Sequence, residues 1–335
     1  MIEKLELTNF TAFKKLTMEF SPGINIFIGQ NGTGKTHLLK LIYAVLAAHS
    51  EEKRVSDKLN SVFLPKGRYL GRLVKRVNVS STARVKITRN GKMLSLKFTN
   101  HTADTLVWNN GWKGEKFRPC VYIPVKEMLA NAPGFLSLYA SREIHFEEIY
   151  ADIIHRAFLP TLKGPVSIER KKLLDLIQKI IEGKVINKDE QFFLKNRGGE
   201  LEFTLLAEGM RKLGLLWLLI QNGTLLKGTT LFWDEPEANL NPSMLDTLVK
   251  ILIHLQRTGV QIFIATHNYI LLKEFDIQKE KQDKVRFYSL YQDPGMDSIN
   301  YVFGTKYIDI VPNTISEAYL DIYNQEIKRS LGGDL

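Results

Sequence analysis

Residues 29–36 carry the stretch that decides the fold of this chain: Gly29-Gln30-Asn31-Gly32-Thr33-Gly34-Lys35-Thr36. The stretch fits the pattern G-x-x-x-x-G-K-[ST] at every position, between an apolar segment typical of a strand and a segment, 35–48, typical of a helix. Glycines let backbone N–H groups turn inward around phosphate oxygens, and the helix N-terminus adds positive potential. We therefore predict a nucleotide phosphate loop rather than a chance glycine-rich turn. Lys35 is expected to reach the β- and γ-phosphates, and Thr36 to offer a hydroxyl to Mg²⁺.

A second motif lies about 200 residues further along the chain, where the apolar strand 230–233 ends in Asp234 and Glu235. Taken alone, this pair also suits a helix cap before Pro236, a residue that often begins helices. Combined with the phosphate loop, it indicates a nucleotide site. Asp234 can then hold Mg²⁺ opposite Thr36, and Glu235 can accept a proton from a water that attacks the γ-phosphate.

A third motif follows the apolar strand 261–265, where Thr266 and His267 stand at the carboxyl end. A histidine in this position is often only a loop residue. Because it follows two other strands of the same kind, we expect His267 to contact the γ-phosphate of ATP.

The remaining hydrophobic pattern predicts alternating strands and helices, which is typical of a parallel α/β fold. Alternation on both sides of Asn90-Gly91 predicts a β-hairpin over 84–98. Further strands are predicted at 2–10, 15–28, 121–125, 190–194, 201–205, 285–291 and 298–303, and further helices at 146–158, 168–181, 210–220, 243–257 and 314–331.

Composition excludes several classes of protein. The 335 residues are 44% hydrophobic and 24% charged, values typical of a globular chain and not of a disordered or fibrous one. A single cysteine, Cys120, excludes an intramolecular disulfide framework and a multi-cysteine zinc site. No apolar run approaches the ~20 residues of a membrane span, and the N-terminus resembles a strand rather than a signal peptide. We therefore expect a cytoplasmic protein without a membrane partner.

Positive charge is concentrated between residues 51 and 118. This segment holds 16 Lys and Arg against 5 Asp and Glu, a balance of 16 − 5 = +11, whereas the whole chain carries 46 − 36 = +10. A solvated surface, a DNA or RNA contact and an anionic membrane surface all fit such a segment. The predicted hairpin places Arg84, Lys86 and Lys97 on the face opposite its apolar side chains, and we expect that face to be basic without balancing acids.

The order of these motifs resembles that of the ABC-type ATPases of the SMC, RecF and OLD group, and the resemblance covers almost the whole chain. The segments that carry it are Leu5-Glu6-Leu7-Thr8-Asn9-Phe10, Ile26-Phe27-Ile28-Gly29-Gln30-Asn31-Gly32, Leu206-Ala207-Glu208-Gly209-Met210-Arg211-Lys212, Asp234-Glu235-Pro236-Glu237-Ala238-Asn239-Leu240-Asn241-Pro242 and Ala265-Thr266-His267-Asn268.

The resemblance implies an ABC-type ATPase head with two lobes. Its mixed sheets would combine antiparallel N-terminal strands with a parallel core that carries the phosphate loop. Lobe I would span residues 1–129, a short helical arm 130–185, and lobe II 186–335. The resemblance also implies a homodimer in which two copies dock head to tail around ATP. In that dimer, Ala207, Glu208 and Gly209 would contact the nucleotide of the other copy, and residues 239–242 would cross the interface.

Two positions depart from the family pattern. Ala207 stands where the family usually has serine, so we expect slow ATP hydrolysis. No clear glutamine loop is present, and the nearest candidate is 123–127. Small stand-alone members of this group resemble partners of a separate, nuclease-like effector in DNA repair or anti-phage defence. The alternatives are the nucleotide-binding subunit of an ABC transporter and an ATP-binding scaffold that does not hydrolyse ATP.

Overall fold

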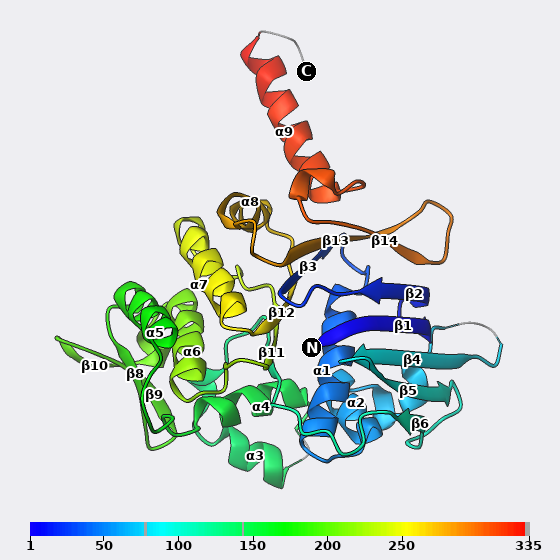
Figure 1. The fold of residues 1–335 in the computed structure, drawn as a ribbon, viewed down its shortest axis with the longest axis horizontal. Helices are drawn as coiled ribbons and strands as arrows, with labels where there is room; N and C mark the ends of the chain where they lie inside the picture. The colour runs from blue at the N-terminus through cyan, green and yellow to red at the C-terminus, as the bar shows by residue number, and fades with distance from the viewer. Residues whose placement is uncertain (77–78, 143, 332–335) are drawn as a thin grey trace.

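The computed structural model describes residues 1–76, 79–142 and 144–331. Residues 77–78 of the basic segment and residues 332–335 of the expected lobe II lie outside the described residues. Two larger sheets and the helices that cover them form the body of the molecule (Figure 1).

The first sheet contains the N-terminal strands and the predicted hairpin. Its order is β2-β1-β4-β5-β6, and every neighbouring pair is antiparallel. Asn90 and Gly91 both have positive φ, 48° and 72°, as a two-residue hairpin turn requires. The hairpin prediction is therefore confirmed. The strands are β1 (Ile2–Phe10), β2 (Phe13–Glu19), β4 (Thr82–Arg89), β5 (Lys92–Thr99) and β6 (Val107–Asn110).

The second sheet forms the centre of the molecule, with the order β14-β13-β3-β12-β11-β7. Only β14 runs antiparallel to its neighbour, so the other five strands end at the same edge. Strands β3, β11 and β12 are buried along their whole length, as their continuous apolar runs predict. The six strands are β3 (Ile24–Gly29), β7 (Val121–Ile123), β11 (Thr230–Asp234), β12 (Gln261–Ala265), β13 (Val285–Gln292) and β14 (Ile299–Gly304).

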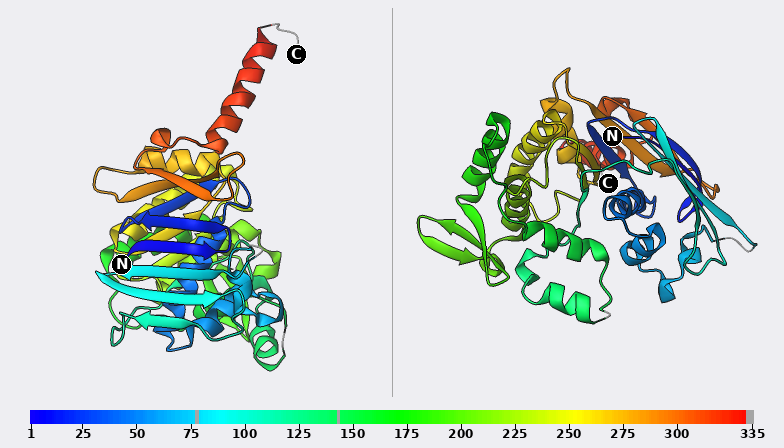
Figure 2. Two further views of the ribbon diagram at one scale, coloured as in Figure 1. Left: turned by 90° about the vertical axis from the view of Figure 1, so that its right-hand side faces the viewer. Right: turned by 60° about the horizontal axis from the view of Figure 1, so that its bottom comes forward.

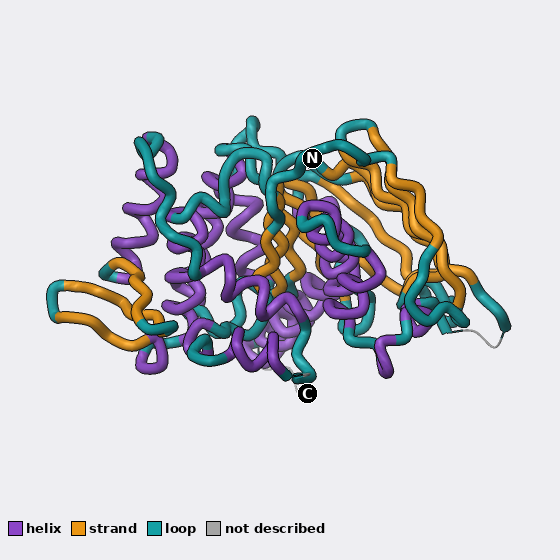
Figure 3. The backbone as a smooth tube through the Cα atoms, turned by 90° about the horizontal axis from the view of Figure 1, so that it is seen from below, coloured by secondary structure: helices purple, strands orange, loops and turns teal. Residues whose placement is uncertain are grey.

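The central sheet separates two hydrophobic cores. Phe27, Phe232 and Phe263 point toward the core that holds α1 (Lys35–Ser50), α2 (Val55–Phe63) and the first sheet. Alternate side chains such as Ile26 and Trp233 point toward the core on the other face. Figures 2 and 3 show the antiparallel strands on one side and most helices on the other. This is the two-lobed α/β architecture that the sequence predicts.

The second core holds most of the remaining helices. They are α3 (Phe135–Ser141), α4 (Glu148–Ala157), α5 (Ile168–Ile181), α6 (Glu208–Gln221), α7 (Leu245–Arg257) and α8 (Tyr269–Gln278). A small antiparallel sheet, β8 (Lys184–Lys188), β9 (Gln191–Asn196) and β10 (Gly199–Glu202), packs beside α6. The last helix, α9 (Thr314–Ser330), projects away from the body (Figure 1). No helix in the described residues is long and apolar enough to cross a membrane.

Two predicted strands were wrong in part. Residues 15–28 form two strands, because the chain turns at Ser21–Gly23 before entering the central sheet. A Cβ on Gly23 would lie 2.4 Å from the Lys284 carbonyl oxygen, so only glycine allows this close approach. The strand predicted at 201–205 ends at Glu202, and a short 3₁₀ helix follows it.

Candidate nucleotide site

The phosphate loop connects the end of β3 to the start of α1. Gly29, Gly32 and Gly34 have φ values of 140°, 83° and 87°, which side chains rarely allow. A Cβ on Gly29 would lie 2.1 Å from the Leu290 carbonyl oxygen. The loop therefore exposes its backbone at positions that larger residues could not occupy.

Lys35 is folded back across this loop. Its Nζ donates hydrogen bonds to the carbonyl oxygens of Gly29, at 2.8 Å, and Gln30, at 2.9 Å. Burial lowers the pKa of Lys35 to about 8, although the nearby Asp234 and Glu235 carboxylates oppose the shift. Thr33 supports the turn because its hydroxyl donates to the Gln30 carbonyl oxygen at 2.9 Å.

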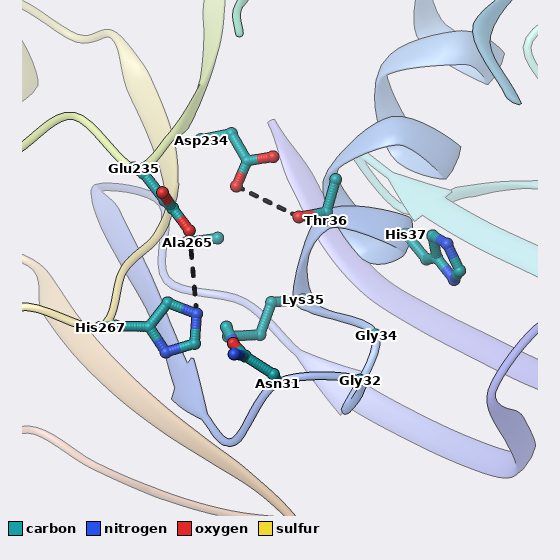
Figure 4. Close-up of a pocket in the computed structure, with 10 residues that line it drawn as sticks. All are labelled: Asn31, Gly32, Gly34, Lys35, Thr36, His37, Asp234, Glu235, Ala265 and His267. Carbon is teal, nitrogen blue, oxygen red and sulfur yellow. Dashed lines mark hydrogen bonds and ion pairs between the residues drawn. The ribbon is translucent and has the colours of Figure 1, made fainter. Parts of the chain in front are cut away.

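Asp234 faces the first turn of α1 from the end of β11. The Thr36 hydroxyl donates to Asp234 Oδ1 at 3.2 Å, and the Tyr122 hydroxyl donates to Asp234 Oδ2 at 3.2 Å (Figure 4 shows the first of these). Burial raises the pKa of Asp234, while these two hydrogen bonds favour its ionised form. Hydroxyl and carboxylate oxygens are the ligands that Mg²⁺ prefers, so Thr36 and Asp234 fit the cation that accompanies ATP.

Glu235 and His267 stand side by side at the ends of β11 and β12. Glu235 Oε1 lies 3.8 Å from His267 Nε2 (Figure 4). Burial, together with the Lys35 cation, lowers the pKa of His267, which favours its neutral form. Glu235 has φ 46°, an uncommon value for a residue other than glycine, and its N–H donates to the Ala265 carbonyl oxygen at 2.9 Å. Such backbone strain is frequent at functional sites.

These groups enclose an open cleft of about 220 Å³. Whole-ligand pockets usually measure roughly 300–1,000 Å³, so the cleft suits the phosphates of a nucleotide better than its full length. Gln30 and Thr33 belong to the same loop but do not line the cleft. The lining residues are Asn31, Gly32, Gly34, Lys35, Thr36, His37, Asp234, Glu235, Ala265 and His267.

The segment 206–212 contributes nothing to this cleft within the same chain. Ala207 is exposed at the start of α6, followed by Glu208, and Gly209 packs against the loop 238–240. A Cβ on Gly209 would lie 2.8 Å from the Asn239 carbonyl oxygen. Lys212 Nζ donates to the Ala238 carbonyl oxygen at 2.7 Å. We call these two joined segments, 206–212 and 238–242, the signature ridge.

The candidate glutamine loop, 123–127, also stays outside the cleft. Its Glu127 is buried, and one carboxylate oxygen lies 3.1 Å from Arg211 Nε on α6. Burial raises the pKa of Glu127. The pair joins this loop to the signature ridge rather than to the nucleotide position.

Sequence reasoning missed three residues that shape the site. Tyr122 holds Asp234, as described above. Glu237 Oε1 accepts hydrogen bonds from the Thr266 hydroxyl, at 2.6 Å, and from the His267 N–H, at 3.3 Å. His37 lines the cleft directly after Thr36. Glu237 was quoted only as part of a motif, and no local signal distinguishes Tyr122 from other strand residues.

Two families of AAA ATPase domains match parts of the chain. Residues 1–105 match a family described as "AAA ATPase domain". Residues 122–273 match a family described as "AAA domain, putative AbiEii toxin, Type IV TA system".

Curated relatives match over a limited region. A DNA replication and repair protein RecF of Oceanobacillus iheyensis is 37% identical over 91 residues, which cover 27% of this chain and 24% of that protein. The protein of the same name from Lactobacillus acidophilus is 38% identical, with the same coverage. These matches span about a quarter of the relatives' length.

Two solved structures share the fold over nearly their full length. An SMC head bound to the C-terminal winged-helix domain of ScpA superposes with a TM-score of 0.56 at 14% identity, covering 92% of this chain and 98% of that one. The Pyrococcus furiosus SMC head with an extended coiled coil, bound to the C-terminal domain of ScpA, gives 0.51 at 12% identity, covering 98% and 100%.

Fold and motif order define the class as an ABC-type ATPase head. Within that class, the chain is similar to the SMC and RecF-like group: two ATPase-domain families match parts of it, the RecF relatives match a quarter of their own length, and its fold is that of SMC heads. The resemblance identified from the sequence is confirmed.

Proposed function

We propose that the chain is an ATP-hydrolysing switch with an open state and a closed state. In the closed state, two copies of the chain share a nucleotide site between them. The observation that carries this proposal is the convergence of Lys35, Thr36, Asp234, Glu235 and His267 on one cleft at the edge of the central sheet. They come from three strand ends that are far apart in the sequence.

The proposed role of each group is consistent with its position in the cleft. Lys35 and the loop N–H groups bind the β- and γ-phosphates, and Thr36 and Asp234 would hold Mg²⁺, which would neutralise phosphate charge. Glu235 accepts a proton from a water molecule while the oxygen of that water bonds to the γ-phosphorus. The bond from that phosphorus to the β–γ bridging oxygen breaks, and ADP and phosphate leave. His267 contacts the γ-phosphate and helps to keep Glu235 in position.

Phosphate release tests the enzymatic part of this proposal. Wild-type protein should release phosphate from Mg-ATP, whereas Lys35→Ala should show no release and no binding of a labelled ATP analogue. Lys227→Ala provides a control cation outside the cleft. Unchanged ATP affinity in Lys35→Ala would reject the assignment of the site. Tight ATP binding without phosphate release would instead support the alternative of a non-hydrolysing scaffold. Ala207, where the family usually has serine, is the reason to retain this alternative.

The switch is proposed to close by head-to-tail docking of two copies. The cleft is open, and the signature ridge, with Ala207, Asn239 and Asn241 exposed, lies outside the cleft of its own chain. Ridge and cleft therefore remain free to meet in a pair of chains. The N–H groups at the start of α6 can supply positive potential to a γ-phosphate held by the other copy.

We further propose that this switch acts on DNA or RNA together with a separate nuclease-like effector, in DNA repair or anti-phage defence. The printed names of the RecF relatives and of the family matched by residues 122–273 support this direction. Association with an effector is tested by co-purification from the source cells with and without the Glu235→Gln substitution. Enrichment of a membrane permease instead would favour the transporter alternative.

The outer face of the first sheet is the proposed nucleic-acid contact. The expectation that this face has no balancing acids was wrong. Glu6 lies on the same face and pairs with Lys4, at 2.9 Å, and with Lys86, at 3.7 Å. A cationic row remains at one end. Thr8 lies opposite both Lys15 and Arg84, and Arg84 lies opposite Lys97, all three cations being exposed.

The salt dependence of binding tests this surface. Each phosphate contact adds about 0.9 to the slope of log K against log salt for duplex DNA. The triple substitution Lys15→Glu, Arg84→Glu, Lys97→Glu should weaken binding and flatten the slope without changing ATP affinity. Reversal of Lys171, Lys172 and Lys179 on α5 is the matched control. If the wild type binds neither DNA nor RNA in a salt-sensitive way, the surface has another role.

A further inference from the structure

Helix α9 is amphipathic, yet none of its residues is buried. It projects from the body, and its free end stands clear of every other element in two perpendicular views (Figures 1 and 2). Its first turns are anchored by Tyr319, which stacks on Tyr269 of α8 at a ring distance of 4.2 Å, and by Ser316, whose hydroxyl donates to Tyr307 at 2.7 Å. Beyond Tyr319 the helix continues into solvent.

The exposed part carries a continuous apolar stripe. Leu320, Tyr323, Ile327 and Leu331 follow one another at intervals of three, four and four residues, so they lie on one side of the helix. Their exposed fractions are 58%, 60%, 39% and 81%. By contrast, α7 has a comparable apolar face that is buried in the core. Exposed stripes of this kind mark interaction surfaces.

Charge along α9 is arranged for a reversed copy of the same helix. The first half of the helix holds only acidic charges, at Glu317 and Asp321, whereas the second half holds Glu326 with Lys328 and Arg329 and is therefore net positive. When two such helices lie antiparallel, the acidic half of each runs beside the basic end of the other, while the apolar stripes meet between them. One patch is then complementary to itself, as a two-fold symmetric contact requires.

We propose that α9 is a dimerisation helix that pairs antiparallel with α9 of a second copy. The nucleotide cleft contains no α9 residue, so this contact needs no ATP. It is distinct from the proposed head-to-tail contact, and the two can be tested separately.

Sedimentation velocity of the full chain without nucleotide tests the pairing. The wild type should sediment as a dimer of about twice 38.4 kDa across the micromolar range. Leu320→Glu, Ile327→Glu should give a folded monomer, with an unchanged circular dichroism spectrum and ATP affinity. Gln325→Glu, on the polar side of α9, should remain dimeric. Lys35→Ala should also remain dimeric, because the contact does not depend on ATP.

Charge exchange tests the antiparallel orientation. Asp321→Lys and Lys328→Glu should each raise the dissociation constant by several-fold, and the double variant should restore it, because Asp321 of each copy faces Lys328 of the other when the apolar stripes meet. A wild type that is monomeric without nucleotide would overturn the proposal. So would a dimer that Leu320→Glu, Ile327→Glu leaves intact. Dimerisation only with Mg-ATP, lost in Lys35→Ala, would support the head-to-tail contact and reject pairing through α9.

Discussion

Among the residues of the cleft, Lys35 is the one whose protonation should affect nucleotide binding most directly. In the free protein its ammonium is buried among two carbonyl oxygens and partly desolvated, which lowers its pKa to about 8. The phosphates of ATP would favour the charged form and raise this pKa. Binding near pH 8 should therefore take up protons.

This proton uptake gives a pH prediction. ATP affinity should fall as the pH rises through about 8 and should be about tenfold weaker at pH 9 than at pH 7, because only the protonated fraction of Lys35 is competent. Calorimetry in buffers of different ionisation enthalpy measures both effects. Lys35→Arg is the control, since its guanidinium stays charged and its affinity should not follow this curve. A flat profile for the wild type would contradict the account.

His267 also allows a test by a single substitution. His267→Ala should lower kcat by roughly 10²–10³-fold, a typical cost of removing a group that stabilises transition-state charge. ADP affinity should stay unchanged, because the histidine is proposed to contact only the γ-phosphate. Steady-state phosphate release and ADP titration measure the two quantities, with the exposed His254→Ala on α7 as control. Equal losses of ADP and ATP affinity would mark His267 as structural.

At the scale of elements, most strands and helices could be predicted because each has a strong hydrophobic period and clear ends. The break between β2 and β3 could not, because it depends on the close approach of Gly23 to Lys284, a contact distant in sequence. Helix α2 and strand β8 are short elements that were not predicted.

The candidate site also has a part that could be predicted from the sequence and a part that could not. Its phosphate loop, acidic strand and histidine are motifs with fixed local spacing, and the structure brings them to one cleft. Tyr122 and Glu237 act through neighbours on adjacent strands or loops. Their positions follow from the sheet order, and no pattern in the sequence specifies that order directly.

Helix α2 depends on a buried lysine. Lys58 Nζ lies 2.7 Å from Asp152, 3.1 Å from Glu148 and 3.3 Å from Glu51, and its side chain has no exposed surface. These ion pairs join α2 to α4 and to the end of α1. The lysine therefore links α1 and α2, which pack in the core with the first sheet, to α4.

Lys58→Met should destabilise the fold by about 3 kcal/mol, because it removes a fully buried cation and leaves the partly buried Asp152 carboxylate without its partner. Thermal unfolding followed by circular dichroism provides the measurement. Lys53→Met is a matched control, since Lys53 pairs with Glu51 and Glu148 but its side chain is half exposed. Its loss should cost less than about 1 kcal/mol. Equal melting temperatures for both variants would show that the Lys58 cluster contributes little.

At the scale of the whole molecule, the central sheet holds the phosphate loop and the acidic strand end at one edge, and the signature ridge is exposed outside that cleft. Under the proposed head-to-tail docking, one chain carries both halves of a site that it does not close alone. The proposed switch is the closure of this site by a second copy, and its opening after hydrolysis.

The most direct test of this claim is the mass of Glu235→Gln in solution, measured in the Leu320→Glu, Ile327→Glu background so that α9 cannot contribute. The amide keeps the shape of Glu235 but cannot accept the water's proton, so ATP should remain bound and the closed dimer should accumulate. We predict a sedimenting mass of about twice 38.4 kDa with Mg-ATP and 38.4 kDa with Mg-ADP. A mass of 38.4 kDa with both nucleotides, together with normal phosphate release, would contradict the account.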